Sequence, residues 1–112
     1  AEATERAAFA AWDVAVLRAV REVETALAAY DAEVRRNRVL IEARDQGQAY
    51  ARRAEARVRL GDATPLLRID ADRTLAQAQL ALAQSELAVA QAQVALFRAL
   101  GGGWRTNKQP LE

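Results

Sequence analysis

Large apolar side chains recur at helical spacing along the first half of the chain. They stand three, four or seven residues apart and form one stripe on a helix: Phe9, Trp12, Val16, Val20, Val23, Leu27, Tyr30, Val34 and Ile41. This spacing is typical of a helix that packs against other helices in a supercoiled arrangement. Alanine, arginine, glutamate and leucine dominate, without proline, so we predict one long helix over about 5–60. Gly47 lies where the stripe thins, and we expect the helix to bend there.

A tight turn is predicted over residues 61–64. Gly61 can take the left-handed conformation that ends many helices. Thr64 can cap a second helix, and Pro65 suits its first position because a fixed φ helps there and no N–H is needed. We therefore expect a second helix over about 65–100 and a tail over 101–112. Helices joined by so short a turn lie antiparallel, so the predicted fold class is all-α, with one helical-hairpin domain.

The second helix is predicted to be apolar on two sides. One seam follows the a-and-d pattern of coiled coils, interrupted by Arg73, and contains Leu66, Ile69, Ala76, Leu80, Ala83, Leu87, Ala90, Val94 and Phe97. A second surface repeats every seven residues at Leu75, Leu82, Val89 and Leu96, and glutamines separate the two. A hairpin needs one buried face per helix, so we expect this second surface to stay exposed within the hairpin.

Two arrangements would bury both surfaces: the wall of a helical tube, or a four-helix bundle formed by two hairpins. The pattern alone does not choose between them. Residues 74–97 contain one charged residue, Glu86, and are long enough to suggest a membrane span. Recurring glutamines and many alanines make a poor hydrocarbon-spanning helix, so we expect no membrane contact by this segment itself.

Charge and reactive residues exclude several functions. The 112 residues include 16 basic and 15 acidic side chains, for a net charge of +1, which gives no reason to expect a nucleic acid partner. Cysteine and histidine are absent, and with them the usual nucleophile, general base and soft metal ligands. A metal site could rest only on Asp70 and Asp72, but residues two apart on a helix point in different directions. We expect no enzyme activity, cofactor or metal.

Four segments resemble one protein family, in matching order and spacing. They are residues 21–30 (REVETALAAY), 56–61 (ARVRLG), 69–75 (IDADRTL) and 99–104 (ALGGGW). On these segments the chain resembles the C-terminal half of a TolC-like outer membrane factor, an outer membrane efflux protein of Gram-negative bacteria. The Gly-Gly-Gly-Trp run that closes a helix is the most specific part of the resemblance.

The resemblance implies a trimeric channel whose barrel in the outer membrane continues as an α-helical tube through the periplasm. This chain would be a periplasmic segment of that tube, with residues 101–104 near the point where the shorter helix stops. Its turn would be the tip that docks a periplasmic adaptor protein, formed by Leu60, Gly61, Asp62, Ala63 and Thr64. Asp70 matches the family's aspartate near the tip, which implies a pore-lining role.

The sequence departs from the family in two respects. Segments of alternating hydrophobicity are not seen, so we expect a fragment that does not include the barrel. Before the matching aspartate, Leu67 replaces an acid and Arg68 replaces an apolar residue, which changes the lining of the tip.

An alternative function stays open, namely a free-standing coiled-coil hairpin that acts as an adaptor or scaffold interaction module. In either case the first helix exceeds the second by about 20 residues, and the unpaired end carries Phe9, Trp12, Val16 and Val20. We expect the isolated chain to self-associate as a dimer or another bundle, because this end is strongly apolar. The competing structure is a three-helix monomer in which the first helix breaks within residues 37–48 and folds back.

Overall fold

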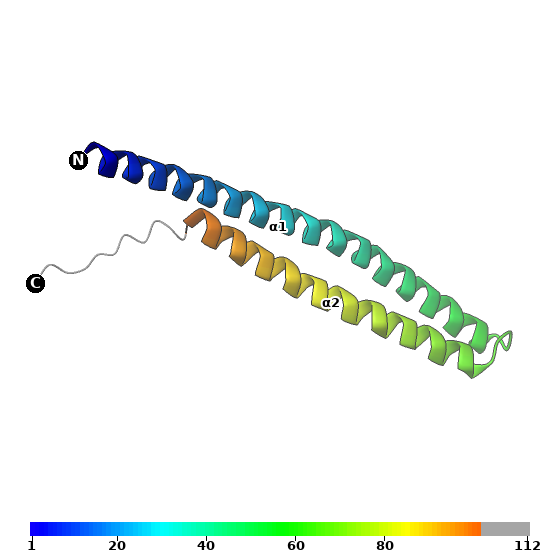
Figure 1. The fold of residues 1–112 in the computed structure, drawn as a ribbon. Helices are drawn as coiled ribbons and strands as arrows, with labels where there is room; N and C mark the ends of the chain where they lie inside the picture. Colours follow the sequence, from blue (N-terminus) through cyan, green and yellow to red (C-terminus); the bar gives the residue numbers. More distant parts are fainter. Residues whose placement is uncertain (102–112) are drawn as a thin grey trace, which may run out of the picture. The chain divides into compact units, whose positions relative to one another are not determined.

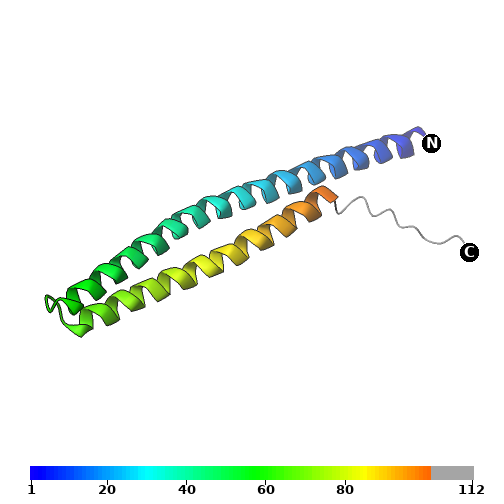
Figure 2. The same ribbon diagram turned by 180° about the vertical axis from the view of Figure 1, so that it is seen from behind.

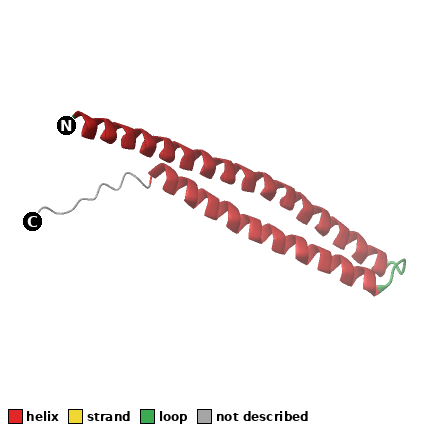
Figure 3. Ribbon diagram, viewed as in Figure 1, coloured by secondary structure: helices red, strands yellow, loops and turns green. Residues whose placement is uncertain are grey.

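The computed structural model describes residues 1–101 and contains two helices (Figure 1). Helix α1 spans Glu2–Arg59 and helix α2 spans Pro65–Gly101. Figure 3 shows these helices and the loop between them, and no strand occurs within residues 1–101. The predicted all-α hairpin is confirmed, with helix ends within a few residues of the expected positions. The predicted tail lies outside the described residues except for Gly101, which belongs to α2.

Helix α1 continues through Gly47 without interruption. The three-helix monomer, in which α1 would break within residues 37–48, is therefore wrong. Glycine costs roughly 1 kcal/mol relative to alanine inside a helix. Gly47 is buried, so packing around it offsets that cost and keeps the helix intact.

The described chain divides into two compact units. One unit combines residues 1–31 of α1 with residues 91–101 of α2, and the other is Ala32–Ala90, which includes the turn. Within each unit the α1 segment runs antiparallel to the α2 segment, as both views show (Figures 1 and 2).

Small side chains dominate the core of the Ala32–Ala90 unit. Ala54 and Ala71 are fully buried, as is Ser85. A Cβ placed on Gly47 would lie 3.5 Å from the Cα of Leu75 on α2, which is an ordinary contact distance between atoms of two closely packed backbones. Residues this small let the two helices approach, so burial here comes from close backbone packing more than from large side chains.

The face of α2 that packs against α1 is not the one that the sequence suggested. Leu82 is buried and Leu75 is half-buried within the Ala32–Ala90 unit, and Leu96 is half-buried in the other unit. The seam with the a-and-d pattern is the exposed, outer one, and it carries large exposed side chains at Leu66, Ile69, Leu80, Leu87, Val94 and Phe97. The expectation that the surface of Leu75, Leu82, Val89 and Leu96 stays exposed is therefore wrong.

The reason lies in the alternation of sizes along α2. Its inward row alternates a large residue with a small one, as in Leu75, Ala78, Leu82 and Ser85, at steps of three and four residues. Leucines in such a row fit beside the small residues of α1, whereas alanine and serine let the backbones close up. The prediction that α2 is apolar on two sides is confirmed, with the two sides exchanged.

The outer side of α2 lacks a partner among residues 1–101. This helix alone in that part of the chain is long and apolar enough to cross a membrane by length and composition, with a mean hydropathy of 1.2 over 18 residues. Such a helix is weak support for a membrane span, because core helices of soluble proteins have the same composition. Only 11% of this window is buried, so most of its surface is open to other helices or to lipid.

In the unit formed by residues 1–31 and 91–101, α1 extends beyond the end of α2 (Figure 1). Val23, Ala26 and Tyr30 are half-buried where α2 lies alongside. All of residues 1–22 are exposed, including the large side chains of Phe9 and Trp12. We call residues 2–20 the overhang of α1.

Candidate docking tip and channel-lining face

The turn between the helices begins with a glycine in a left-handed conformation. Gly61 has a φ of +77°, and its N–H donates to the carbonyl oxygen of Val58 at 3.1 Å. The N–H of Asp62 donates to the carbonyl oxygen of Arg57 at 2.9 Å. These two bonds form a Schellman motif, which satisfies carbonyl groups that a helix end otherwise leaves without partners. The predicted helix end at Gly61 is confirmed.

Three residues separate Gly61 from the start of α2. Pro65 is its first residue, as predicted from its fixed φ. The carbonyl oxygen of Thr64 accepts the N–H of Leu67 at 3.0 Å, so this residue closes the first turn through its backbone. The sequence pointed to Thr64 as a cap, and the position is right, although the contact with Leu67 uses the carbonyl group of Thr64 and not its hydroxyl.

An arginine of α1 holds the turn from the side. The Nε of Arg57 donates to the Oδ2 of Asp62 at 3.1 Å, and its Nη2 lies 3.5 Å from the carbonyl oxygen of the same residue. Both side chains are exposed, so the ion pair by itself contributes little to stability. Its effect is to fix the direction in which the chain leaves α1.

The five predicted tip residues come together in this turn. Leu60, Gly61, Asp62 and Thr64 are exposed, and Ala63 is half-buried. Leu60 is 82% exposed, which is the largest exposure among the large apolar residues of the described chain. The space around Gly61 is open, because a Cβ placed there would meet no atom within 4 Å. The tip thus presents an apolar side chain and accessible backbone beside one another.

Asp70 lies on the exposed surface of α2. Its carboxylate pairs with Arg73 at 3.3 Å, one turn further along the helix. Asp72 pairs with a different arginine, Arg68, at 3.8 Å, so the two aspartates do not converge. Within residues 1–101 no group of three or more potential metal ligands is found.

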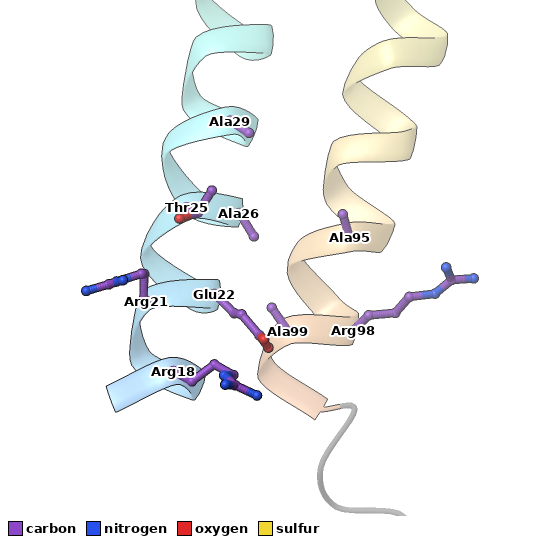
Figure 4. Close-up of a pocket in the computed structure, with 9 residues that line it drawn as sticks. All are labelled: Arg18, Arg21, Glu22, Thr25, Ala26, Ala29, Ala95, Arg98 and Ala99. Atoms are coloured by element: carbon purple, nitrogen blue, oxygen red, sulfur yellow. The ribbon is translucent and has the colours of Figure 1, made fainter. Parts of the chain in front are cut away.

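A shallow groove lies between α1 and α2 in the unit formed by residues 1–31 and 91–101 (Figure 4). Its alanines come from both helices: Ala26, Ala29, Ala95 and Ala99. Glu22 reaches toward Ala99, whereas Arg21 and Arg98 point away from the groove (Figure 4). A small-molecule site needs polar groups that converge, and this groove has none. Its small side chains instead allow another helix to approach closely.

Comparison with known proteins gives relatives over nearly the whole chain. The chain is 36% identical to the outer membrane protein OprJ of Pseudomonas aeruginosa over 104 residues, which is 93% of the chain and 22% of that protein. It is 37% identical to the probable efflux pump outer membrane protein TtgC of Pseudomonas putida over 98 residues, 85% of the chain and 20% of that protein. The chain is a segment of a TolC-like outer membrane efflux protein.

A third relative is the pyoverdine export outer membrane protein OpmQ of Pseudomonas putida, with 36% identity over 107 residues, 96% of the chain and 23% of that protein. The chain therefore spans about a fifth of the length of the curated outer membrane efflux proteins it matches. No family model matches it. No solved structure matches it either.

Two features of this efflux protein segment were missed in the sequence. Arg57 approaches Asp62 only because Gly61 reverses the chain between them. The only sign of this contact in the sequence was an arginine four residues before the glycine that ends the helix. The amide of Asn37 donates to the Oγ of Ser85 at 3.3 Å from a position 48 residues away. A lone serine in a row of alanines and leucines was its only sign. The residues that close the family resemblance, 102–104, lie outside the described residues.

Proposed function

We propose that this chain forms part of the periplasmic α-helical wall of an outer membrane efflux channel, and that its turn docks a periplasmic adaptor protein. Two of the relatives, TtgC and OpmQ, are efflux or export proteins of the outer membrane by name, and the matches to them cover 85% and 96% of this chain. In the complete protein, three copies would build the tube. The chain itself performs no chemistry and supplies surface.

The observation that carries the wall assignment is the pair of apolar faces on α2. One face packs against α1, and the other is exposed along a row of large side chains that includes Leu80, Leu87 and Val94. A helix that is apolar on opposite sides is stable when helices cover both of them. The exposed alanines within the outer face, Ala76, Ala83 and Ala90, allow neighbouring hairpins to approach, as the wall of a narrow tube requires.

The docking assignment rests on the geometry of the tip. A tip-to-tip contact with a second helical hairpin needs a turn with little bulk and a defined backbone. Gly61 has no side chain and Ala63 has a small one, and the contacts between Arg57 and Asp62 hold the turn in place. One such contact is small and weak, but a ring of copies around the channel end multiplies it.

The pore-lining assignment concerns Asp70 alone. It lies two turns from Thr64 on the exposed surface of α2. In a trimer its carboxylate would recur around the narrow end of the lumen, where a ring of like charges attracts cations. Arg73, which pairs with it here, would reduce that charge or exchange for a neighbour's arginine.

A chimera tests the proposed function directly. Residues 1–101 replace the matching segment of OprJ in a strain that lacks OprJ, and the chimera is scored for trimer formation and for growth in the presence of toxic compounds that the strain tolerates only when it carries OprJ. The proposal predicts trimers and restored resistance. A control chimera carries Leu87→Glu on the outer face of α2 and is expected to lose trimers. The wall assignment would be contradicted if the unmodified chimera formed no trimers and restored no resistance while intact OprJ did both in the same strain.

A further inference from the structure

The row of α1 residues that faces α2 continues into the overhang. Val23 and Ala26 are half-buried beside α2. Steps of three and four residues toward the start of α1 reach Ala19, Val16, Trp12 and Phe9, which lie on the same face of the helix. Phe9 is 70% exposed and Trp12 is 65% exposed. The overhang therefore carries the continuation of a packing seam for which residues 1–101 supply no partner.

The length of the overhang is set by the end of α2. Figure 4 places Ala99, two residues before the end of α2, beside Glu22 of α1. Residues 2–20 lie at or beyond the end of α2, where only Arg18 lines the groove formed with Arg98 and Ala99, and every one of them is exposed.

The overhang of a second copy fits this stretch in antiparallel orientation. When Phe9 of one copy lies opposite Trp12 of the other, the symmetry of a two-fold pair repeats the contact. In that register residue 2 lies opposite residue 19, so the two overhangs match in length. Glu2 and Glu5, which occupy the seam nearer the helix start, then lie toward the ends of the paired stretch, where water remains accessible.

Charge agrees with this register. Arg6 and Asp13 each follow a seam residue directly and therefore flank the seam on one side, seven residues apart. In an antiparallel pair the equivalent flanks face one another, so Arg6 of each copy faces Asp13 of the other. Alanines at positions 8 and 15 occupy the opposite flank, where they allow close approach.

We propose that two copies of this chain associate through their overhangs, with residues 2–20 of each copy antiparallel and Phe9 packed against Trp12. Aromatic side chains bury roughly 150–250 Å² each. Four of them, with Val16 and the flanking alanines, approach the roughly 1,200 Å² at which specific protein interfaces begin. The expected product is a reversible dimer. This inference concerns the chain in isolation and does not rest on the efflux function.

Sedimentation equilibrium of the full 112-residue chain over a range of concentrations tests the proposal. The wild-type chain is expected to show a monomer–dimer equilibrium. Trp12→Glu is expected to weaken it by more than roughly tenfold, because truncating or charging a central aromatic anchor removes most of the binding energy. Leu17→Glu is the matched control, since Leu17 is 67% exposed but lies on another face of the same helix, and it should leave the dimer unchanged.

A charge exchange tests the register. Arg6→Glu and Asp13→Arg are each expected to weaken the dimer, and the double variant is expected to restore it. A monomeric wild-type chain would overturn the proposal, as would equal effects of Leu17→Glu and Trp12→Glu. Dissociation by Leu87→Glu would show that the outer face of α2 mediates association instead. Failure of the double variant to restore what both single changes weaken would exclude this register.

Discussion

Arg57 and Asp62 make three polar contacts with each other across the end of α1. The arginine side chain contacts the aspartate carboxylate at 3.1 Å and the aspartate carbonyl oxygen at 3.5 Å, and the aspartate N–H donates to the arginine carbonyl oxygen at 2.9 Å. Two residues thus fix both the side and the backbone of the turn that we propose as the docking tip. The arrangement orders the turn without burying it.

Removal of the Arg57 side chain should loosen the turn and leave the fold intact. Exposed ion pairs contribute about 0–1 kcal/mol, so Arg57→Ala is expected to lower the free energy of unfolding by less than about 1 kcal/mol. Exchange of the Asp62 amide hydrogen should nevertheless become faster, because local opening no longer breaks the side-chain contacts. Arg59→Ala, which removes only a pair with Glu55, is the control. Unchanged exchange at Asp62 in the Arg57 variant would show that the arginine does not order the turn.

Gly47 and Gly61 should respond to alanine with opposite signs. At Gly47 the added Cβ would lie 3.5 Å from the nearest atom across the interface, which is ordinary contact, and the helix would gain about 0.5–1 kcal/mol of stability. At Gly61 no atom lies within 4 Å, but a φ of +77° costs an L-residue about 1–2 kcal/mol. Urea denaturation of both variants measures the difference. A loss of stability in Gly47→Ala would mean that the helices pack more tightly there than the structure indicates.

The hydrogen bond between Asn37 and Ser85 should be coupled in a double-mutant cycle. Ser85 is 1% exposed, so Ser85→Ala leaves a partly buried amide of Asn37 without its acceptor and is expected to cost about 1 kcal/mol. Asn37→Leu together with Ser85→Ala replaces both polar groups by apolar ones and should be at least as stable as the wild-type chain. Urea midpoints of the two single variants and the double variant give the coupling. Strictly additive effects would show that this pair does not help to fix the register of α1 against α2.

Asp70 is expected to influence ion flow if it lines the pore. In the OprJ chimera, Asp70→Ala should lower cation selectivity in single-channel recordings, because the ring of charge at the narrow end is lost. Asp72→Ala is the matched control on the same turn of α2, where the carboxylate pairs with Arg68. Equal conductance and selectivity in the Asp70 variant and the unmodified chimera would remove Asp70 from the pore.

Most of the helical architecture could be predicted from single residues. Gly61 and Pro65 mark the helix ends because one tolerates a positive φ and the other fits the first helical turn. The two apolar faces of α2 were also visible as separate periodicities. Which of them meets α1 was not, because that choice depends on how leucines of α2 fit beside small residues of the partner helix, such as Gly47, that are distant in sequence.

The contacts that shape the tip and the core were likewise not predictable from the sequence. Arg57 reaches Asp62 only after the chain has reversed, and Asn37 meets Ser85 only after α2 has folded back along α1. Neither pair has a local signature, because its spacing corresponds to no helical repeat. The proposed tip residues followed from the family resemblance, whereas the contacts that hold them became visible only in the three-dimensional structure.

Site-specific crosslinking in cells tests the proposed docking most directly. The chain contains no cysteine, so Ala63→Cys places a single thiol at the tip of the OprJ chimera, provided that the rest of the host is cysteine-free. A single cysteine is introduced at the tip of the helical hairpin of the adaptor from the same pump. The matched control is Gln84→Cys, which lies on the exposed surface of α2. We expect a disulfide between adaptor and channel from Ala63→Cys and none from Gln84→Cys. Crosslinks from Gln84→Cys without any from Ala63→Cys would contradict docking at the tip.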